Sequence, residues 1–218
     1  MKKAFKVLIL DYKVSNLKSV SNALDYLEIK NEITSEAKKI INSDGVILPG
    51  VGSFSQGMHN LNSLDLIEPI KEFIFSEKLF IGICLGMQLL FDRSYEFCNS
   101  PGLGVFKGEV KSFRTKNKFC RIPHVGWNKV DINTSIPKDN SKLNPFKNIS
   151  KNQNLFYFVH SFFALPENSD NILTETNYAN IKFCSSILKK NVFASQFHPE
   201  KSGNSGLKVL KNIFGNFQ

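Results

Sequence analysis

One cysteine in a frame of glycines constrains this chain more than any other feature. Residues 79–83 form an apolar run, Gly82 and Gly86 flank Cys84 as Gly-x-Cys-x-Gly, and an apolar pattern of helical period follows. This layout is typical of a nucleophile elbow, in which a strand reverses sharply into a helix and pushes the nucleophile outward. The glycines are expected because a Cβ would collide across the tight turn. A helix that begins just after Cys84 also favours the thiolate through its N-terminal dipole.

The competing interpretation is that Cys84 is an ordinary buried core cysteine, which is the commoner fate of a lone cysteine. Core burial, however, requires neither flanking glycine. The four cysteines of the chain (Cys84, Cys98, Cys120 and Cys184) form no C-x-x-C pair. The sequence therefore indicates no metal site, no cofactor and no disulfide framework, and a cytoplasmic location is expected.

Strand-like and helical segments alternate over the first 90 residues. Apolar runs of strand length predict strands at 5–10, 44–48 and 79–83. Helical spacing predicts helices at about 17–27, 64–75 and 85–91. Ser15 or Asn16 is the expected N-cap of the first helix, and Pro69 either kinks the second or lies in its first turn. This alternation predicts a parallel sheet with helices on both faces.

The second half of the chain has a different texture, in which glycines punctuate short β-like runs such as 110–113. Residues 133–154 are rich in Asn, Lys, Ser and Pro and are predicted to form an exposed loop. Further strands are predicted at 155–159, 183–188 and 192–197, and a final helix carries Leu207, Leu210, Ile213 and Phe214 on one face. No repeat or long linker divides the chain, so residues 1–218 are predicted to form a single domain.

The formal charge of +9 raises the question of nucleic-acid binding. The lysines are scattered, never more than two in a row, and no aromatic-basic interleaving of the kind that binds single strands is present. We therefore expect no nucleic-acid partner, although a basic surface suits a phosphorylated ligand or an acidic protein. No apolar stretch approaches the roughly 18 residues of a membrane span. Lys6 and Asp11 interrupt the N-terminal apolar run too early for a signal peptide.

A cysteine nucleophile needs a base, and the base needs an orienting group. His198 and Glu200 lie at i and i+2, so in an extended backbone both side chains leave the same face. Pro199 between them fixes φ and stiffens the turn. By itself this motif is equally compatible with a surface turn. Because it follows an apolar strand in a chain with a cysteine elbow, we interpret Cys84, His198 and Glu200 as a catalytic triad.

The third requirement is an oxyanion hole. Residues 49–52, Pro-Gly-Val-Gly, end the predicted strand 44–48, at the sheet edge where ligands bind in such folds. Gly50 and Gly52 let the backbone approach an acyl carbon closely and rotate its amides. The expected donors are the N–H groups of Val51 or Gly52 and of Leu85. A Pro-Gly sequence by itself usually indicates only a turn, so this prediction depends on the position of residues 49–52 at the end of a predicted parallel strand.

These three motifs together resemble the class I glutamine amidotransferases, in which a Cys-His-Glu triad hydrolyses glutamine and passes ammonia to a synthase. Residues 10–20, 122–128, 157–162 and 196–202 resemble the glutaminase subunit of imidazole glycerol phosphate synthase. The resemblance spans nearly the whole chain, and the Pro-His-x-Gly-Trp-Asn segment at 123–128 is its most specific part. The chain departs from it at Lys13 and Ser15, where many members have glycine in a loop expected to face the partner.

The resemblance implies an α/β, three-layer class I glutamine amidotransferase fold, with a central, mostly parallel sheet flanked by helices and a small antiparallel β region. It also implies a partner, a (β/α)8-barrel cyclase subunit. Ammonia passed to this cyclase would convert a phosphoribulosyl-formimino aminoimidazole carboxamide nucleotide into imidazole glycerol phosphate and aminoimidazole carboxamide ribotide, in histidine biosynthesis. The identity of this acceptor rests on the resemblance alone.

The resemblance also suggests substrate and partner contacts. The expected substrate-binding residues are Gly50, Gly52, Gln88, Ser161 and Phe162. The expected partner-contact or tunnel-mouth residues are Asn16, His124, Trp127, Asn128 and Lys201. Gln88 lies one helical turn after the nucleophile, where a solvated glutamine is the alternative. Lys201 either pairs with an acidic residue of the cyclase or is simply solvated. His160 is interpreted as a structural residue near the pocket rather than a second catalytic histidine.

Two rival functions remain open from the sequence. One is a related amidotransferase that feeds ammonia to a different synthase, for example one that modifies a sugar. The other is a non-catalytic assembly subunit that keeps the fold, against which the intact Cys84, His198 and Glu200 argue. Co-purification with a barrel cyclase and a glutaminase assay would separate these possibilities.

Overall fold

The computed structural model describes residues 5–14, 16–133, 143–150 and 154–215. Its helices are α1 (Leu17–Tyr26), α2 (Ala37–Ile41), α3 (Phe54–Ser63), α4 (Ile67–Phe75), α5 (Leu85–Leu89) and α6 (Gly203–Phe214), with short 3₁₀ turns η1 (Phe113–Thr115), η3 (Ser169–Asn171) and η4 (Pro199–Lys201). Its strands are β1 (Val7–Leu10), β2 (Asn31–Thr34), β3 (Gly45–Leu48), β4 (Leu79–Ile83), β5 (Phe91–Ser94), β6 (Ser100–Pro101), β7 (Phe106–Ser112), β8 (His124–Lys129), β9 (Asp131–Ile132), β10 (Leu155–His160), β11 (Phe162–Pro166), β12 (Ile172–Tyr178), β13 (Ile181–Lys189) and β14 (Val192–Ser195).

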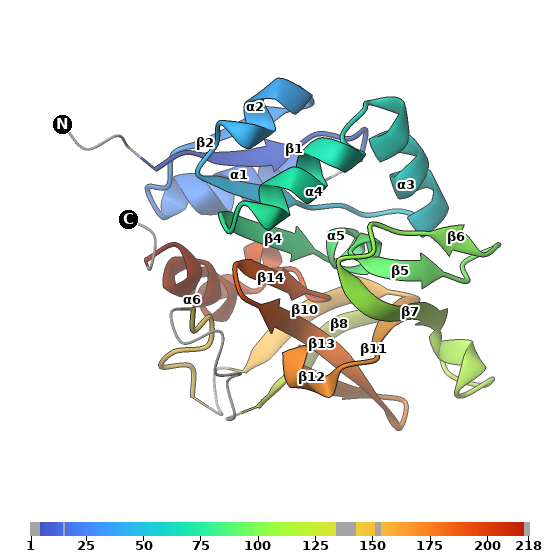
Figure 1. Cartoon of the computed structure of the whole chain (residues 1–218). Helices are drawn as coiled ribbons and strands as arrows, with labels where there is room; N and C mark the ends of the chain where they lie inside the picture. The colour runs from blue at the N-terminus through green and yellow to red at the C-terminus, as the bar shows by residue number, and fades with distance from the viewer. Residues whose placement is uncertain (1–4, 15, 134–142, 151–153, 216–218) are drawn as a thin grey trace.

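The largest sheet crosses the molecule with the strand order β2-β1-β3-β4-β14-β13-β12-β9 (Figure 1). The strands from β2 to β14 pair in parallel, and β13, β12 and β9 add to them antiparallel. The predicted mostly parallel sheet is therefore confirmed. The pairing that matters for function is that of β4 with β14, which sets Ile83 opposite Ser195. This pairing brings the segments of Cys84 and His198 together at one sheet edge.

Strand β1 shows why the fold has three layers. Val7 and Ile9 pack into a core that includes residues of α1 and α6, whereas Leu8 and Leu10 pack into a core with α2, α3 and α4. All four side chains are buried. A continuous apolar run is what a parallel strand covered on both faces requires, because alternate side chains point to opposite faces.

Two smaller sheets complete the fold and supply one wall of the site. Strands β10 and β8 form an antiparallel pair, and β11, β7, β5 and β6 form a four-stranded sheet in that order. The chain passes from one small sheet to the other between His160 and Phe162. The expected small antiparallel region is present, although β5 and β7 within it run parallel.

Several predicted boundaries are corrected by the structure. Helix α4 begins at Ile67, which places Pro69 in its first turn. Helix α5 ends at Leu89 rather than near residue 91, because Phe91 opens β5 and pairs with Phe106 of β7. Strand β1 begins at Val7 rather than at residue 5. The sequence patterns had not indicated β2, α2, α3 or β12.

The segment 133–154 is only partly the exposed loop expected. Leu143, Phe146 and Ile149 are buried in the hydrophobic core, where the ring of Phe146 lies 5.9 Å from that of Phe156 and 6.3 Å from that of Phe197. These three apolar residues are scattered among Asn and Lys, so no strand or helix periodicity in the sequence indicated that they pack into the core. Residues 134–142 and 151–153 of the predicted loop lie outside the described residues.

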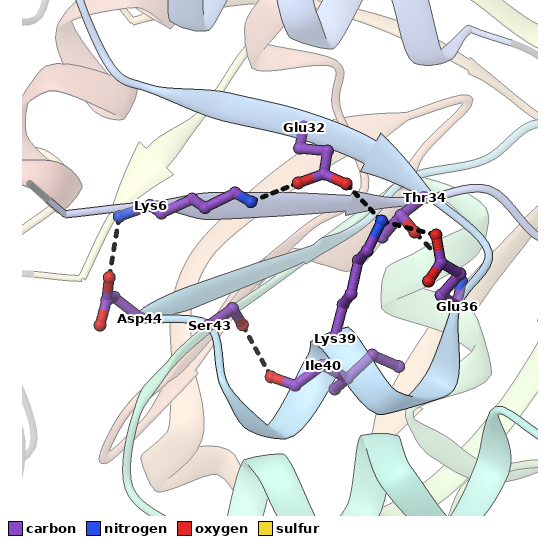
Figure 2. Close-up of polar contacts among 8 residues, drawn as sticks. All are labelled: Lys6, Glu32, Thr34, Glu36, Lys39, Ile40, Ser43 and Asp44. Atoms are coloured by element: carbon purple, nitrogen blue, oxygen red, sulfur yellow. Dashed lines mark hydrogen bonds and ion pairs between the residues drawn. The ribbon is translucent and has the colours of Figure 1, made fainter.

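Charged side chains cover the β2 edge of the main sheet, as Figure 2 shows. Glu32 on β2 pairs with Lys6 and, at 2.8 Å, with Lys39 of α2, which also reaches Glu36 at 2.5 Å. The backbone N–H of Lys6 donates to Asp44 at 2.9 Å. The hydrogen bonds from Lys39 and Lys6 lower the pKa of Glu32 to about 2. Such charges on an edge strand oppose pairing with a second molecule.

Among the described residues, no helix is both long enough and apolar enough to span a bilayer.

Candidate active site

Cys84 occupies a strained turn between β4 and α5. Its φ of 53° and ψ of −106° lie in a region that few non-glycine residues adopt, and its N–H donates to the Ser195 carbonyl at 2.7 Å. A Cβ on Gly82 would lie 3.0 Å from the carbonyl oxygen of Gly86, across the turn, as predicted. A Cβ on Gly86 would lie 1.8 Å from the carbonyl oxygen of Leu48. Gly86 is therefore required by the close approach of β3 as well as by the turn.

His198 and Glu200 lie beside this turn, just beyond β14. The Nδ1 atom of His198 is 2.7 Å from Oε1 of Glu200, and both side chains are buried. Glu200 lies in η4, so the backbone between them is a 3₁₀ turn and not the extended segment expected. The Nε2 atom of His198 and the Oε2 atom of Glu200 have no hydrogen-bond partner among the described residues. The structure thus brings the three predicted residues together.

The protonation of His198 follows from its neighbours. Burial by itself lowers the pKa of His198, but attraction to Cys84 and Glu200 outweighs burial and raises that pKa to about 10. A protonated ring between a sulfur and a carboxylate is the state in which the histidine can give a proton to a leaving group.

Asn16 makes a contact with the site that the sequence did not indicate. Its Nδ2 donates to Oε1 of Glu200 at 2.5 Å, so this carboxylate oxygen accepts from two donors. Asn16 is the N-cap residue of α1, one of the two predicted positions, but its φ is 79° and its side chain makes no capping hydrogen bond to the helix. Ser15, the alternative cap, lies outside the described residues. Lys13 adopts a φ of 62°, the left-handed region that favours glycine, so the loop keeps this turn without one.

Two of the predicted oxyanion donors, the N–H groups of Val51 and Leu85, are not aligned in this structure. The N–H of Leu85 donates to the carbonyl oxygen of Gly50 at 3.3 Å. Because a peptide is planar and trans, the Val51 N–H points opposite to that carbonyl and hence away from Leu85. Val51 and Leu85 therefore cannot donate to one oxyanion until the peptide between Gly50 and Val51 rotates.

Tyr12 holds the loop that carries these groups. Its hydroxyl donates to the Pro49 carbonyl at 2.5 Å, and the ring is fully buried. A Cβ on Gly50 would lie 2.3 Å from this hydroxyl oxygen, so only glycine leaves room for Tyr12. Burial, reinforced by Cys84 nearby, raises the pKa of Tyr12 far above its usual range and keeps the hydroxyl a donor.

A pocket of about 220 Å³ opens beside the sulfur of Cys84. Its lining comprises Val51, Gly52, Cys84, Leu85, Gln88, Glu96, Pro123, Val159, His160, Ser161 and Phe162. Of the predicted substrate-binding residues, only Gly50 is missing from this lining. Gln88 is buried and bonded within the protein, so the solvated alternative is wrong.

Glu96 is a pocket residue that the sequence analysis missed. Its Oε2 accepts from the Phe54 N–H at 2.6 Å, and burial raises the pKa of Glu96. Glu96 is the one acidic side chain among the residues that line the pocket. No motif surrounds it, so its position in the tertiary structure was the only signal that could reveal it.

Two buried histidines, His124 and His160, lie side by side, and His160 also lines the pocket. His160 Nδ1 donates to the Phe162 carbonyl at 2.8 Å, which leaves Nε2 to accept from His124 Nδ1 at 3.0 Å. Burial lowers the pKa of His160 to about 3 and that of His124 to about 4, so both rings are neutral. These bonds tie His160 to its protein neighbours, which agrees with the structural role predicted for it. His124 is only 3% exposed, and the expectation of a direct surface contact is wrong for its side chain.

Other residues predicted to meet a partner lie at the surface. Trp127 is 55% exposed, Lys201 is exposed, and Asn128 is partly exposed while its Nδ2 lies 3.2 Å from His124 Nε2. Val125 and Leu155, on the paired strands β8 and β10, are 55% and 41% exposed. Because Val125 and Trp127 alternate along β8 and Leu155 pairs with Lys129, these three exposed apolar side chains lie on one face.

The fold occurs in known amidotransferases. It matches a solved structure described as a glutamine amidotransferase with a TM-score of 0.68 at 14% identity, over 96% of this chain and 97% of that one. It also matches a chain in the structure of PurLQS from Thermotoga maritima, with a TM-score of 0.71 at 19% identity, over 99% and 100% of the two chains. The family model for glutamine amidotransferase class-I matches residues 8–217, so this chain is a class-I glutamine amidotransferase.

Curated relatives narrow the family. The chain is 46% identical over 205 residues to the imidazole glycerol phosphate synthase subunit HisH of Caldanaerobacter subterraneus subsp. tengcongensis, covering 94% of this chain and 95% of the relative. It is 42% identical over 210 residues to subunit HisH 1 of Legionella pneumophila strain Lens, covering 95% and 97%. The chain belongs to the HisH family.

Proposed function

We propose that this chain hydrolyses glutamine with Cys84 as nucleophile, His198 as acid and base, and Glu200 as the group that orients His198. One observation carries the proposal. A strained cysteine opens on a pocket beside a buried histidine whose Nδ1 is bound at 2.7 Å to a buried carboxylate. Nucleophile, base and orienting group within reach of one another are the requirements of covalent acyl transfer.

The reaction has two halves. The thiolate of Cys84 attacks the side-chain carbonyl carbon of glutamine, and His198 gives its proton to the departing ammonia, which leaves a thioester. Water then attacks the thioester, His198 takes a proton from the water, and glutamate leaves as the thiolate re-forms. Glu200 holds the ring by Nδ1 throughout, so Nε2 stays directed to the reacting atoms.

The pocket offers complementary groups for glutamine. The carboxylate of Glu96 suits the α-ammonium group. Gln88 uses its Nε2 on the protein, so its Oε1 is the atom it offers a ligand. Ser161 and Phe162 are assigned to the amino and carboxylate groups of the substrate, and Gly52 to the oxyanion side.

We further propose that the ammonia passes to a (β/α)8-barrel cyclase subunit bound at the exposed face of Val125, Trp127 and Leu155, in the cytoplasm. Exposed apolar side chains clustered on one face are typical of an interaction surface. Asn16 and Lys201 border the triad and are assigned to the same contact. Bound in this way, the chain is the glutaminase subunit of an imidazole glycerol phosphate synthase of histidine biosynthesis.

The test is Cys84→Ala in the complex with the cyclase. Glutamine-dependent synthesis should fall below about a thousandth of wild type, because only ammonia production uses the sulfur. Synthesis from added ammonia should persist, because that chemistry belongs to the partner. Residual glutamine-dependent turnover would make Cys84 the wrong nucleophile. Failure to bind a barrel cyclase would instead point to another synthase, and a wild-type complex without glutaminase activity would point to an assembly subunit.

A further inference from the structure

Gln196 is a buried amide that the triad does not include. It follows β14 directly, its side chain is fully buried, and its N–H donates to the Ser185 carbonyl at 2.9 Å. Its Nε2 lies 3.6 Å from Sγ of Cys84, within the range of a hydrogen bond to sulfur. Gln196 does not line the pocket, so it approaches the sulfur from the side away from the substrate.

The hydrogen-bond network determines which end of this amide faces the sulfur. The carbonyl oxygen of Phe162 can only accept, so the Gln88 atom 2.9 Å away must be its Nε2. The same Nε2 lies 2.9 Å from the Gln196 side chain, which must present its Oε1 there. The NH₂ group of Gln196 is therefore turned toward Cys84. The carbonyl of Phe162 thus fixes the orientation of both side-chain amides, Gln88 and Gln196.

The sulfur has neighbours that favour different protonation states. The Val159 carbonyl, 3.9 Å away, accepts from a thiol but repels a thiolate, whereas the N–H of Gln196 stabilises a thiolate. The other titratable groups around the sulfur are protonated His198, which is attracted to it, the neutral hydroxyl of Tyr12, and Glu96 and His160 across the pocket. Of the uncharged neighbours, Gln196 supplies the N–H directed at the sulfur.

We propose that Gln196 is a thiolate-stabilising residue, which donates a hydrogen bond from Nε2 to the Cys84 sulfur and holds it for attack. This inference rests on the proposed role of Cys84 as nucleophile. The same bond is available each time the sulfur leaves the thioester, because the departing atom is again a thiolate. The effect belongs to the chemical step, since Gln196 contacts Cys84 and Gln88 from behind and does not itself line the pocket.

The experiment measures the pH dependence of iodoacetamide alkylation in the full chain, read at the Cys84 peptide by mass spectrometry because exposed Cys98 also reacts. Gln196→Met keeps the length of the side chain and removes the donor. The midpoint of the profile should rise by about one pH unit, and the rate should fall about ten-fold at pH values well below the wild-type midpoint. The plateau at high pH should match wild type, because the sulfur is fully ionised there. In the complex, kcat should fall while KM for glutamine stays constant.

Asn191→Leu is the matched control. Asn191 is a buried amide just before β14 that bonds the Ile74 and Lys78 carbonyls, so its loss weakens the same strand without touching the sulfur. Its alkylation profile should keep the wild-type midpoint. The inference would be overturned if the midpoint of Gln196→Met did not shift, or if only the high-pH plateau of its alkylation rate fell. It would also be overturned if Asn191→Leu shifted the midpoint by the same amount.

A second variant covers the case in which Gln196→Met does not fold. Gln88→Met removes the bond that orients the Gln196 amide, so the midpoint should shift in the same direction, and an unchanged midpoint would count against the proposal. The failure of the proposed function has a separate signature. If Cys84→Ala retains glutaminase activity, the nucleophile is misassigned, whereas an inactive Cys84→Ala with an unshifted Gln196→Met profile refutes only the role of Gln196.

Discussion

Single residues in this protein are held in positions that their own preferences oppose. Cys84 adopts a positive φ, and the carboxylate of Glu200 is buried where two donors, from His198 and Asn16, converge on one oxygen. Both arrangements cost folding free energy, which a purely structural role would not require. Their concentration within one sheet edge is what marks the site.

The roles of the base and its orienting group predict unequal losses. His198→Ala should reduce glutamine turnover nearly as much as loss of Cys84, because both proton transfers fail. Glu200→Gln keeps an acceptor oxygen for His198 and Asn16 but removes the charge that helps to raise the pKa of His198, so its loss should be smaller by one to two orders of magnitude, roughly as in other triads. Steady-state kcat in the complex measures both. A Glu200→Gln variant worse than His198→Ala would reverse the assigned roles.

At the scale of elements, the site depends on two parallel strands that are distant in sequence. β4 ends at the turn of Cys84 and β14 ends three residues before His198, and their pairing in register sets Cys84 beside His198. One edge strand of the sheet is β2, where Glu32, Lys6 and Lys39 form ion pairs (Figure 2).

This edge predicts a pH-dependent contribution to stability. Because the pKa of Glu32 is lowered from 4.5 to about 2 in the folded state, its ionised form stabilises the fold above about pH 4.5, and this contribution is lost as the pH falls toward 2. Glu32→Gln should therefore lower the urea midpoint modestly at pH 7, and the gap from wild type should narrow below pH 4.5.

Glu68→Gln on α4 is the control for the edge. Its carboxylate is 74% exposed and pairs with Lys71 at 3.1 Å, so the change in urea midpoint should be small at every pH. A gap for Glu32→Gln that stays constant or grows toward acid pH would contradict the assignment of stability to this edge.

At the scale of the whole molecule, the structure brings the proposed triad residues together, whereas the proposed oxyanion donors Val51 and Leu85 are not aligned. The Leu85 N–H is occupied by the Gly50 carbonyl, and the Tyr12 hydroxyl anchors the preceding carbonyl of Pro49. A rotation of the single peptide between Gly50 and Val51 would present the missing donor without movement of the triad. A partner bound nearby would therefore need to favour only this one peptide rotation to complete the oxyanion hole.

The isolated chain should therefore be a poor glutaminase that its partner activates. Loss of one oxyanion donor costs about 10²- to 10³-fold in kcat, which sets the expected stimulation by the nucleotide-loaded cyclase. Alkylation of Cys84 should proceed with or without the partner, because it needs no oxyanion hole. Equal glutaminase rates for the isolated chain and the complex would refute this mechanism.

Gly52→Ala is the variant that tests the loop itself. A Cβ on Gly52 meets nothing within 4 Å, although its φ of 124° disfavours alanine, so the substitution restricts the backbone without a collision. It should reduce stimulation by the cyclase more than it changes KM for glutamine. Gly50→Ala is unsuitable, because its Cβ would strike the Tyr12 hydroxyl.

The sequence by itself determined the elements whose signal is local. The glycine frame of Cys84, the apolar runs of β1 and β4, and the His-Pro-Glu turn each depend on neighbouring residues, so their patterns predicted the elbow, the parallel sheet and the triad. Residue types also predicted that the 49–52 loop supplies oxyanion donors. Steric limits and side-chain periodicity act over a few residues, which is why such features can be read from the chain.

Only the tertiary structure decided the contacts between distant segments. The bond from Asn16 to Glu200, the amide of Gln196 against Cys84 and the carboxylate of Glu96 in the pocket join residues that no local pattern relates. The early end of α5 and the rotated Gly50 carbonyl follow from packing against β7 and from a competing hydrogen bond. Hydrogen bonds and close packing between distant segments depend on how the whole chain folds, and a local sequence pattern does not reveal those positions.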